Sequence, residues 1–114
     1  MSTIDISQVY DLLYRLGITA NYMGFFHTAR AVYLSAQQPE KLLFVTKWLY
    51  PEVAKCYQIS WLCVERNIRT ASGLAWTQNR TMLEQLSHQA LPVKPSASRF
   101  IAILTAYLLD QSVA

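Results

Sequence analysis

Residues 51–77 constrain the fold most, because a helix-starting proline, Pro51, and a helix-capping serine, Ser60, predict two helices separated by only three residues. The residue before a proline disfavours helical geometry, so Pro51 starts a new helix, which we expect to end at Tyr57. Three residues follow, and the last of them, Ser60, can cap a longer helix over 61–77. Two helices joined this closely are a helix-turn-helix candidate. We expect its small internal core to consist of Val53, Ala54, Ile59, Val64 and Ile68.

Helical spacing of apolar residues continues on both sides of this segment, and too few alternating runs occur to build a sheet. Gly17 supplies the end of a first helix, Pro39 suits the first turn of another, and Asn79 can cap a helix after the central pair. We therefore expect one all-α domain over residues 1–114, a compact bundle of about six helices. Besides the central pair, the predicted helices span 6–16, 23–37, 40–49, 79–89 and 98–110.

Length and composition limit the classes of protein. A chain of 114 residues, 53% apolar and 15% charged, can build one hydrophobic core but no second independent one. Its longest apolar run, residues 100–109, is about half of the ~20 residues that cross a bilayer, and the N-terminus lacks a signal-peptide pattern. We expect a cytoplasmic protein without a membrane segment. Cys56 and Cys63 form neither a CxxC motif nor a disulfide framework, so we expect buried or partly buried free thiols.

Enzymatic chemistry finds little support in the sequence. His27 and His88 have no acidic or cysteine partner at ligand spacing, which argues against a metal site. No phosphate-binding loop, glycine-rich fingerprint or nucleophile motif occurs. We expect a protein that is not an enzyme and carries no cofactor.

The net charge of +3 is unevenly distributed. Residues 1–40 carry a net charge of −1, whereas residues 41–99 hold eight basic and three acidic side chains. This asymmetry suggests an anionic partner.

On the helix predicted over 61–77, Glu65, Arg66 and Arg69 fall together on the side opposite the apolar residues. One interpretation is a solvated face, on which Glu65 and Arg69 form a pair worth ~0.3–0.5 kcal/mol. The other is DNA recognition, because the second helix of a helix-turn-helix enters the major groove, where arginine matches guanine and glutamate accepts from cytosine. Gly73 is either a tolerated weakness or a place of close approach.

Short blocks follow one another along residues 5–109: LGITA at 16–20, Gly24-Phe25, TKWLYPEVAK at 46–55, VERNIR at 64–69, LAW at 74–76 and KPSASRFIA at 94–102. Together they resemble the C-terminal DNA-binding domain of the sporulation master response regulator family, stage zero sporulation protein A. The resemblance implies an all-helical fold of about six helices, a sequence-specific transcriptional regulator of bacteria, and double-stranded DNA as the partner. It also implies tandem copies on adjacent sites, or a homodimer.

Carried over by position, the resemblance implies that Glu65, Arg66 and Arg69 contact bases and that Lys94 contacts a phosphate. We add Ser60, Thr70 and Arg80 as predicted phosphate contacts. The chain departs from the family at Leu62 and Cys63, where the family has polar and basic residues, and at Thr70, where it has a histidine.

The family's regulators also carry a phosphoacceptor receiver domain, and these 114 residues contain no acidic pocket or α/β alternation of that kind. We expect either a free-standing effector or a part of a longer protein. Phosphorylation is not expected to control the protein through these residues.

A second hypothesis is a helical protein-interaction module that kept the fold and lost or weakened DNA binding. Trp61 and Leu62, at the start of the recognition-helix candidate, favour a protein interface over a phosphate backbone. The C-terminal helix leaves two interpretations open, core packing or a surface for a partner subunit. Its apolar residues are Phe100, Ile103, Leu104, Tyr107 and Leu108.

Overall fold

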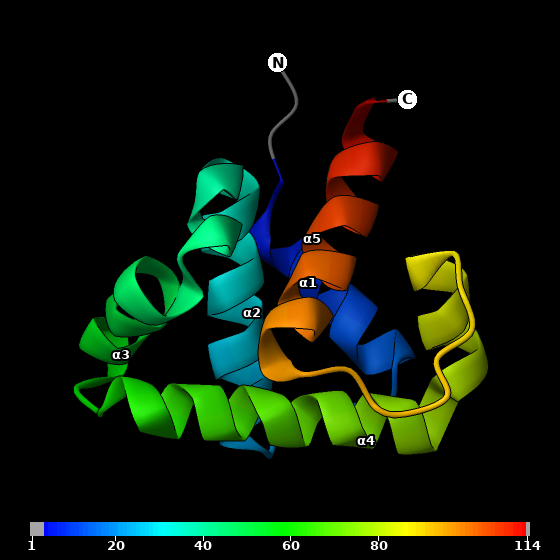
Figure 1. The fold of residues 1–114 in the computed structure, drawn as a ribbon, viewed down its shortest axis with the longest axis horizontal. Coiled ribbons are helices and arrows are strands. Elements are labelled where there is room, and N and C mark those ends of the chain that lie inside the picture. The colour runs from blue at the N-terminus through cyan, green and yellow to red at the C-terminus, as the bar shows by residue number, and fades with distance from the viewer. Residues whose placement is uncertain (1–3, 114) are drawn as a thin grey trace.

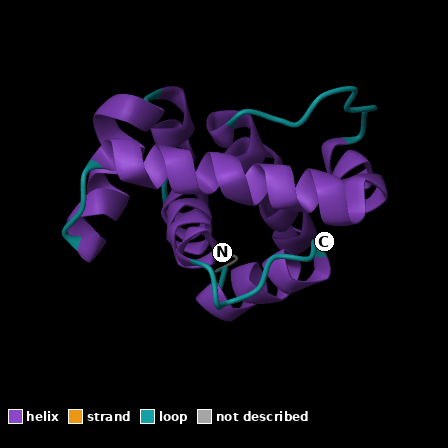
Figure 2. Ribbon diagram, turned by 90° about the horizontal axis from the view of Figure 1, so that it is seen from below, coloured by secondary structure: helices purple, strands orange, loops and turns teal. Residues whose placement is uncertain are grey.

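The computed structural model describes residues 4–113, with side chains to residue 111, and every regular element in this range is helical. Figure 1 shows α4 crossing the ends of α2 and α5, and Figure 2 shows the same crossing from below. The all-α prediction is confirmed, but the described chain has five α-helices and not about six. They are α1 (Ile6–Arg15), α2 (Met23–Gln37), α3 (Tyr50–Tyr57), α4 (Trp61–Ser87) and α5 (Ala97–Val113), with a 3₁₀ segment η1 (Pro39–Leu43) and a π-helical segment η2 (Val45–Leu49) before α3.

A hydrophobic cluster to which every helix contributes fills the space between them. The predicted core of the central helix pair is confirmed for Val53, Ala54, Val64 and Ile68, which are 0–5% exposed. Ile59 is the exception, with 37% exposed. The chain leaves α3 through the left-handed Gln58 (φ 56°), so the next side chain turns away from the core.

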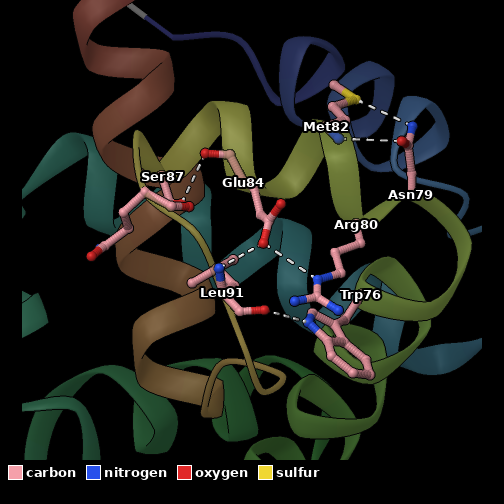
Figure 3. A network of polar contacts seen from close by, with 8 residues as sticks. Trp76, Asn79, Arg80, Met82, Glu84, Ser87 and Leu91 are labelled. Carbon is pink, nitrogen blue, oxygen red and sulfur yellow. Dashed lines mark hydrogen bonds and ion pairs between the residues drawn. The ribbon is translucent and has the colours of Figure 1, made fainter.

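The two helices that we expected over 61–77 and 79–89 meet at a kink inside α4, which counts as one helix, and this accounts for part of the lower helix count. α4 runs through to Ser87 with a kink at Asn79, whose backbone is non-helical (φ −152°, ψ 61°). The Asn79 Oδ1 accepts from the Met82 amide at 3.3 Å, so the predicted capping role is confirmed (Figure 3). Its Nδ2 donates to the Arg15 carbonyl at 3.0 Å, which ties the kink to the end of α1.

The helix predicted over 40–49 is also absent as an α-helix. Phe44 interrupts it with a non-helical backbone (φ −138°, ψ 54°) between η1 and η2. Lys41 turns inward, is only 4% exposed, and pairs with Glu52 of α3, while its Nζ lies 5.5 Å from the centre of the Trp48 ring. The contacts of Lys41 with α3 and η2 therefore decide the backbone of residues 40–49, although their local sequence pattern favours an α-helix.

Four of the five apolar residues singled out on α5 are core, and the fifth, Tyr107, is only partly buried. Phe100 and Leu104 have no exposed surface, and Ile103 and Leu108 are 8% and 6% exposed. The alternative that this surface receives a partner subunit is therefore wrong for these residues. α5 is apolar around most of its circumference because other helices surround it.

α2 meets α4 at a glycine. A Cβ at Gly24 would lie 2.2 Å from a ring carbon of Tyr22 and 2.6 Å from the carbonyl oxygen of Asn67 in α4. The Tyr22 hydroxyl donates to that same carbonyl at 3.0 Å. One turn along α2, the His27 Nδ1 lies 3.2 Å from the Asn67 side-chain amide, and its ring packs edge-on against Tyr57. The crossing therefore depends on a close backbone approach flanked by two polar contacts.

We expect Gly24→Ala to lower the free energy of unfolding by ~1–3 kcal/mol, because backbone oxygen and an anchored ring block the added methyl. Gly73→Ala is the matched control. A Cβ there meets only Lys94, at 3.6 Å, so this change should be neutral or stabilising by up to ~1 kcal/mol through helix propensity. Denaturant unfolding of both variants measures the difference, and equal effects would contradict the close approach at Gly24.

Burial lowers the pKa of the His27 imidazole below its ordinary value. The unfolded chain then binds a proton more readily, so the free energy of unfolding should fall as the pH drops through about 6.5 and level off below the lowered pKa of the folded state. Unfolding curves between about pH 7.5 and 5.5 test this. His27→Gln should remove this part of the pH dependence, whereas His88→Gln, at an exposed site, should retain it.

Candidate nucleic-acid interface

The three-residue connection between α3 and α4 has a defined geometry. The Ile59 amide donates to the Ala54 carbonyl at 3.2 Å, which closes α3. Ser60 is extended (φ −76°, ψ 152°), and its Oγ accepts from the Cys63 amide at 3.2 Å. The predicted N-cap is therefore confirmed, and the exposed first turn of α4 is held against the end of α3.

The structure brings Glu65, Arg66 and Arg69 together on the outward side of α4, opposite the buried Val64 and Ile68. This group of three is the outward face. Arg69 Nη1 lies 3.4 Å from Glu65 Oε1, and their side chains are 50% and 29% exposed. The Arg66 guanidinium is exposed and approaches the Cys63 sulfur at 3.6 Å. The solvated pair expected from spacing exists, and both arginines remain accessible.

Thr70 is exposed on the same side of α4, but its hydroxyl is engaged. Oγ1 donates to the Arg66 carbonyl one turn back, at 3.1 Å. A phosphate oxygen needs a donor, so Thr70 would have to release this bond before it could hold a phosphate.

Glu65 forms one edge of a hollow of about 280 Å³ at the start of α4. Tyr50 lies at its base with 1% exposed. Burial, and next the negative charge of Glu65, raise the pKa of Tyr50 to about 12. Trp61 and Leu62 line the hollow from α4, and Ala97 lines it from α5.

Lys94 reaches the outward side of α4 from the loop that precedes α5. A Cβ built on Gly73, one turn beyond Arg69, would lie 3.6 Å from Lys94 Cδ and 3.7 Å from Nζ. These are ordinary van der Waals distances that do not require glycine, so Gly73 is the tolerated weakness in helix propensity and Lys94 packs beside it. The ammonium group of Lys94 extends the positive surface formed by Arg66 and Arg69.

Three hydrogen bonds that the sequence did not predict hold this loop along α4. The Ser72 hydroxyl donates to the Pro95 carbonyl at 2.8 Å in a buried site. The Trp76 indole donates to the Leu91 carbonyl at 3.3 Å, and the Leu91 amide donates to Glu84 at 2.6 Å (Figure 3). A polar Ser72 beside the apolar residues of α4 indicates that its hydroxyl needs a hydrogen-bond partner. The spacing of residues could not predict that this partner is the Pro95 carbonyl.

Arg80 is set apart from the outward face. It follows Arg69 by 11 residues and lies beyond the kink at Asn79. Its Nε is 3.3 Å from Glu84 Oε2, and its guanidinium carbon is 5.0 Å from the centre of the Trp76 ring (Figure 3). The structure therefore places Arg80 in the network that anchors the loop.

The two histidines lie in different parts of the fold and do not form a common site. His27 is buried between α2 and α4, whereas His88 is exposed at the left-handed end of α4 (φ 59°). Both cysteines are free thiols; Cys63 is partly buried as expected, but Cys56 is exposed, so the expected burial is wrong for that residue. Within the described residues, no group of three or more histidine, cysteine or acidic side chains could hold a metal ion. The described helices also include none that is long and apolar enough to cross a membrane.

The Glu84 carboxylate connects Arg80 with the loop. Its pKa is lowered, first by the hydrogen bond from the Leu91 amide and then by Arg80. We expect Glu84→Gln to speed hydrogen exchange of the Leu91 amide, with no change at the amide of a core residue such as Ile68. Glu40→Gln, an exposed site in η1, is the charge-matched control. Unchanged exchange at Leu91 would show that the negative charge of Glu84 does not hold the loop, because the glutamine oxygen can still accept the bond.

One family model matches this chain. It is described as the sporulation initiation factor Spo0A C terminal, and it covers residues 9–108, nearly the whole chain. The matched stretch contains the outward face of α4, the loop with Lys94 and most of α5. The resemblance drawn from the sequence blocks is confirmed, and the chain belongs to the Spo0A C-terminal family.

Proposed function

We propose that the protein is a sequence-specific DNA-binding regulator of transcription that places the first half of α4 in the major groove. In this proposal α3 and α4 form a helix-turn-helix, and the whole chain is one DNA-binding domain in the cytoplasm of a bacterial cell. The observation that carries it is the position of Lys94 beside Gly73, one turn beyond Arg69, on the side of α4 that carries the exposed Arg66 and Arg69. Family membership supports it, because the family suggests a DNA-binding effector domain.

Base contacts suit the chemistry of the outward face. A guanidinium fork matches guanine O6 and N7, and a carboxylate accepts from cytosine N4. Arg69 must leave Glu65, but an exposed pair of this kind is worth only ~0.3–0.5 kcal/mol. A bidentate base contact discriminates by ~1–3 kcal/mol, so base contact should win in the complex.

Phosphate contacts fall to groups around this face. Lys94 is exposed and has three ammonium donors, and Ser60 lies at the exposed start of α4, where helix N–H groups favour anions. Thr70 and Arg80 would first have to exchange their present partners, so we expect them to contribute less. We also propose that two copies occupy adjacent sites, which the protein-to-duplex ratio of the complex would test.

A second candidate function, a protein-interaction module, is favoured by exposed apolar side chains at the end of η1 and at the start of α4. Leu43, Phe44 and Leu62 are 76%, 51% and 61% exposed, and Trp61 is 37% exposed. Buried α5 residues no longer support this candidate. A protein interface of this kind should tolerate salt, whereas a DNA complex should not.

Selection of binding sites from random duplexes, followed by a salt titration, tests the proposal. DNA binding through several phosphates should weaken steeply between about 50 and 200 mM salt. Failure to bind any duplex at low salt, with helical circular dichroism retained, would reject DNA binding and favour the protein-interaction candidate.

On the selected duplex, we expect Arg69→Ala to lose ~1–3 kcal/mol of discrimination at one base pair. Lys94→Ala should instead weaken all duplexes alike and reduce the salt slope by about one. Arg15→Ala removes the same charge from the end of α1 and should do neither. Equal losses on selected and random DNA for Arg69→Ala would contradict its assignment to a base.

A further inference from the structure

Leu62 is an apolar side chain in the middle of a charged surface. It precedes Arg66 by four residues and Arg69 by seven, so helical spacing puts it on the outward side of α4, one turn nearer the helix start. Its exposed fraction is 61%, against 37% for the neighbouring Trp61. Both residues line the hollow above Tyr50, but most of Leu62 faces away from the protein.

The position of Leu62 restricts what it can meet if α4 enters the major groove. The first turns of a recognition helix reach base edges. The edges of guanine, cytosine and adenine present donors and acceptors there, and covering these with an isobutyl group would desolvate them without replacement hydrogen bonds. Thymine alone presents an apolar group, its C5 methyl. Leucine has no other favourable partner among the base edges.

We propose that Leu62 determines specificity by packing against the C5 methyl of a thymine near the base pair contacted by Arg66. This inference rests on the proposed DNA binding. Four helical residues rise about 6 Å and stacked base pairs about 3.4 Å, which places the thymine one or two base pairs from the pair contacted by Arg66. The chain thus uses an apolar contact at a position where the family resemblance implies a polar one.

Deoxyuridine substitution tests this contact directly. Deoxyuridine lacks the C5 methyl and keeps the Watson–Crick pairing, and the methyl projects only into the major groove. The probe is the duplex recovered by selection from random sequences, with its thymines replaced one at a time. Wild-type protein should bind one substituted duplex about fourfold more weakly, the equivalent of ~0.8 kcal/mol for one buried methyl-sized group.

Three variants complete the test. Leu62→Ala should lose the sensitivity to that deoxyuridine and keep its response to the base pair of Arg66, whereas Leu62→Met should retain most of it. Leu43→Ala removes another exposed leucine, in η1, and should leave the sensitivity unchanged. Circular dichroism confirms that each variant is folded.

The outcomes separate this inference from the proposed function. Salt-sensitive binding that tolerates deoxyuridine at every position, or an unaltered sensitivity in Leu62→Ala, overturns the role of Leu62 and leaves DNA binding in place. No binding to any duplex at low salt overturns both.

Discussion

The approach of α2 to α4 at Gly24 is the contact on which the rest of the structure depends. Only a residue without a side chain lets the two backbones come this close, and Tyr22 and His27 then engage Asn67 from either side. This holds one side of α4 against the core. The opposite side, which carries Arg66 and Arg69, is left exposed to solvent.

Competition among weak and strong polar contacts decides which charges are available. Arg69 is held by a single exposed carboxylate, whereas Arg80 has both a carboxylate and an indole ring. The cation nearer the helix start is therefore the easier one to transfer to a base or phosphate. The spacing of residues in the sequence could not predict which of the two arginines is held more strongly.

Local signals predicted much of the fold. The caps at Ser60 and Asn79 and the buried stripe of α4 depend on residues within one or two turns, and they are confirmed. Long-range contacts account for what was missed. Residues 40–49 abandon the α-helix where Lys41 reaches Glu52, and the loop before α5 gains partners on α4. No periodicity within a segment encodes such partners.

For the candidate site, the sequence predicted which side of α4 carries the charges but not how Lys94 joins them. The loop resembles a flexible connection in composition, being rich in proline and serine. Its backbone is nevertheless bonded to Ser72, Trp76 and Glu84 at both ends.

Those bonds have a thermodynamic consequence. A mobile loop would lose conformational entropy on binding, and that loss would subtract from affinity. Here the loop backbone has already been ordered during folding, so the loop and the helix approach a ligand as one preorganised body. Complex formation then needs little rearrangement of the backbone.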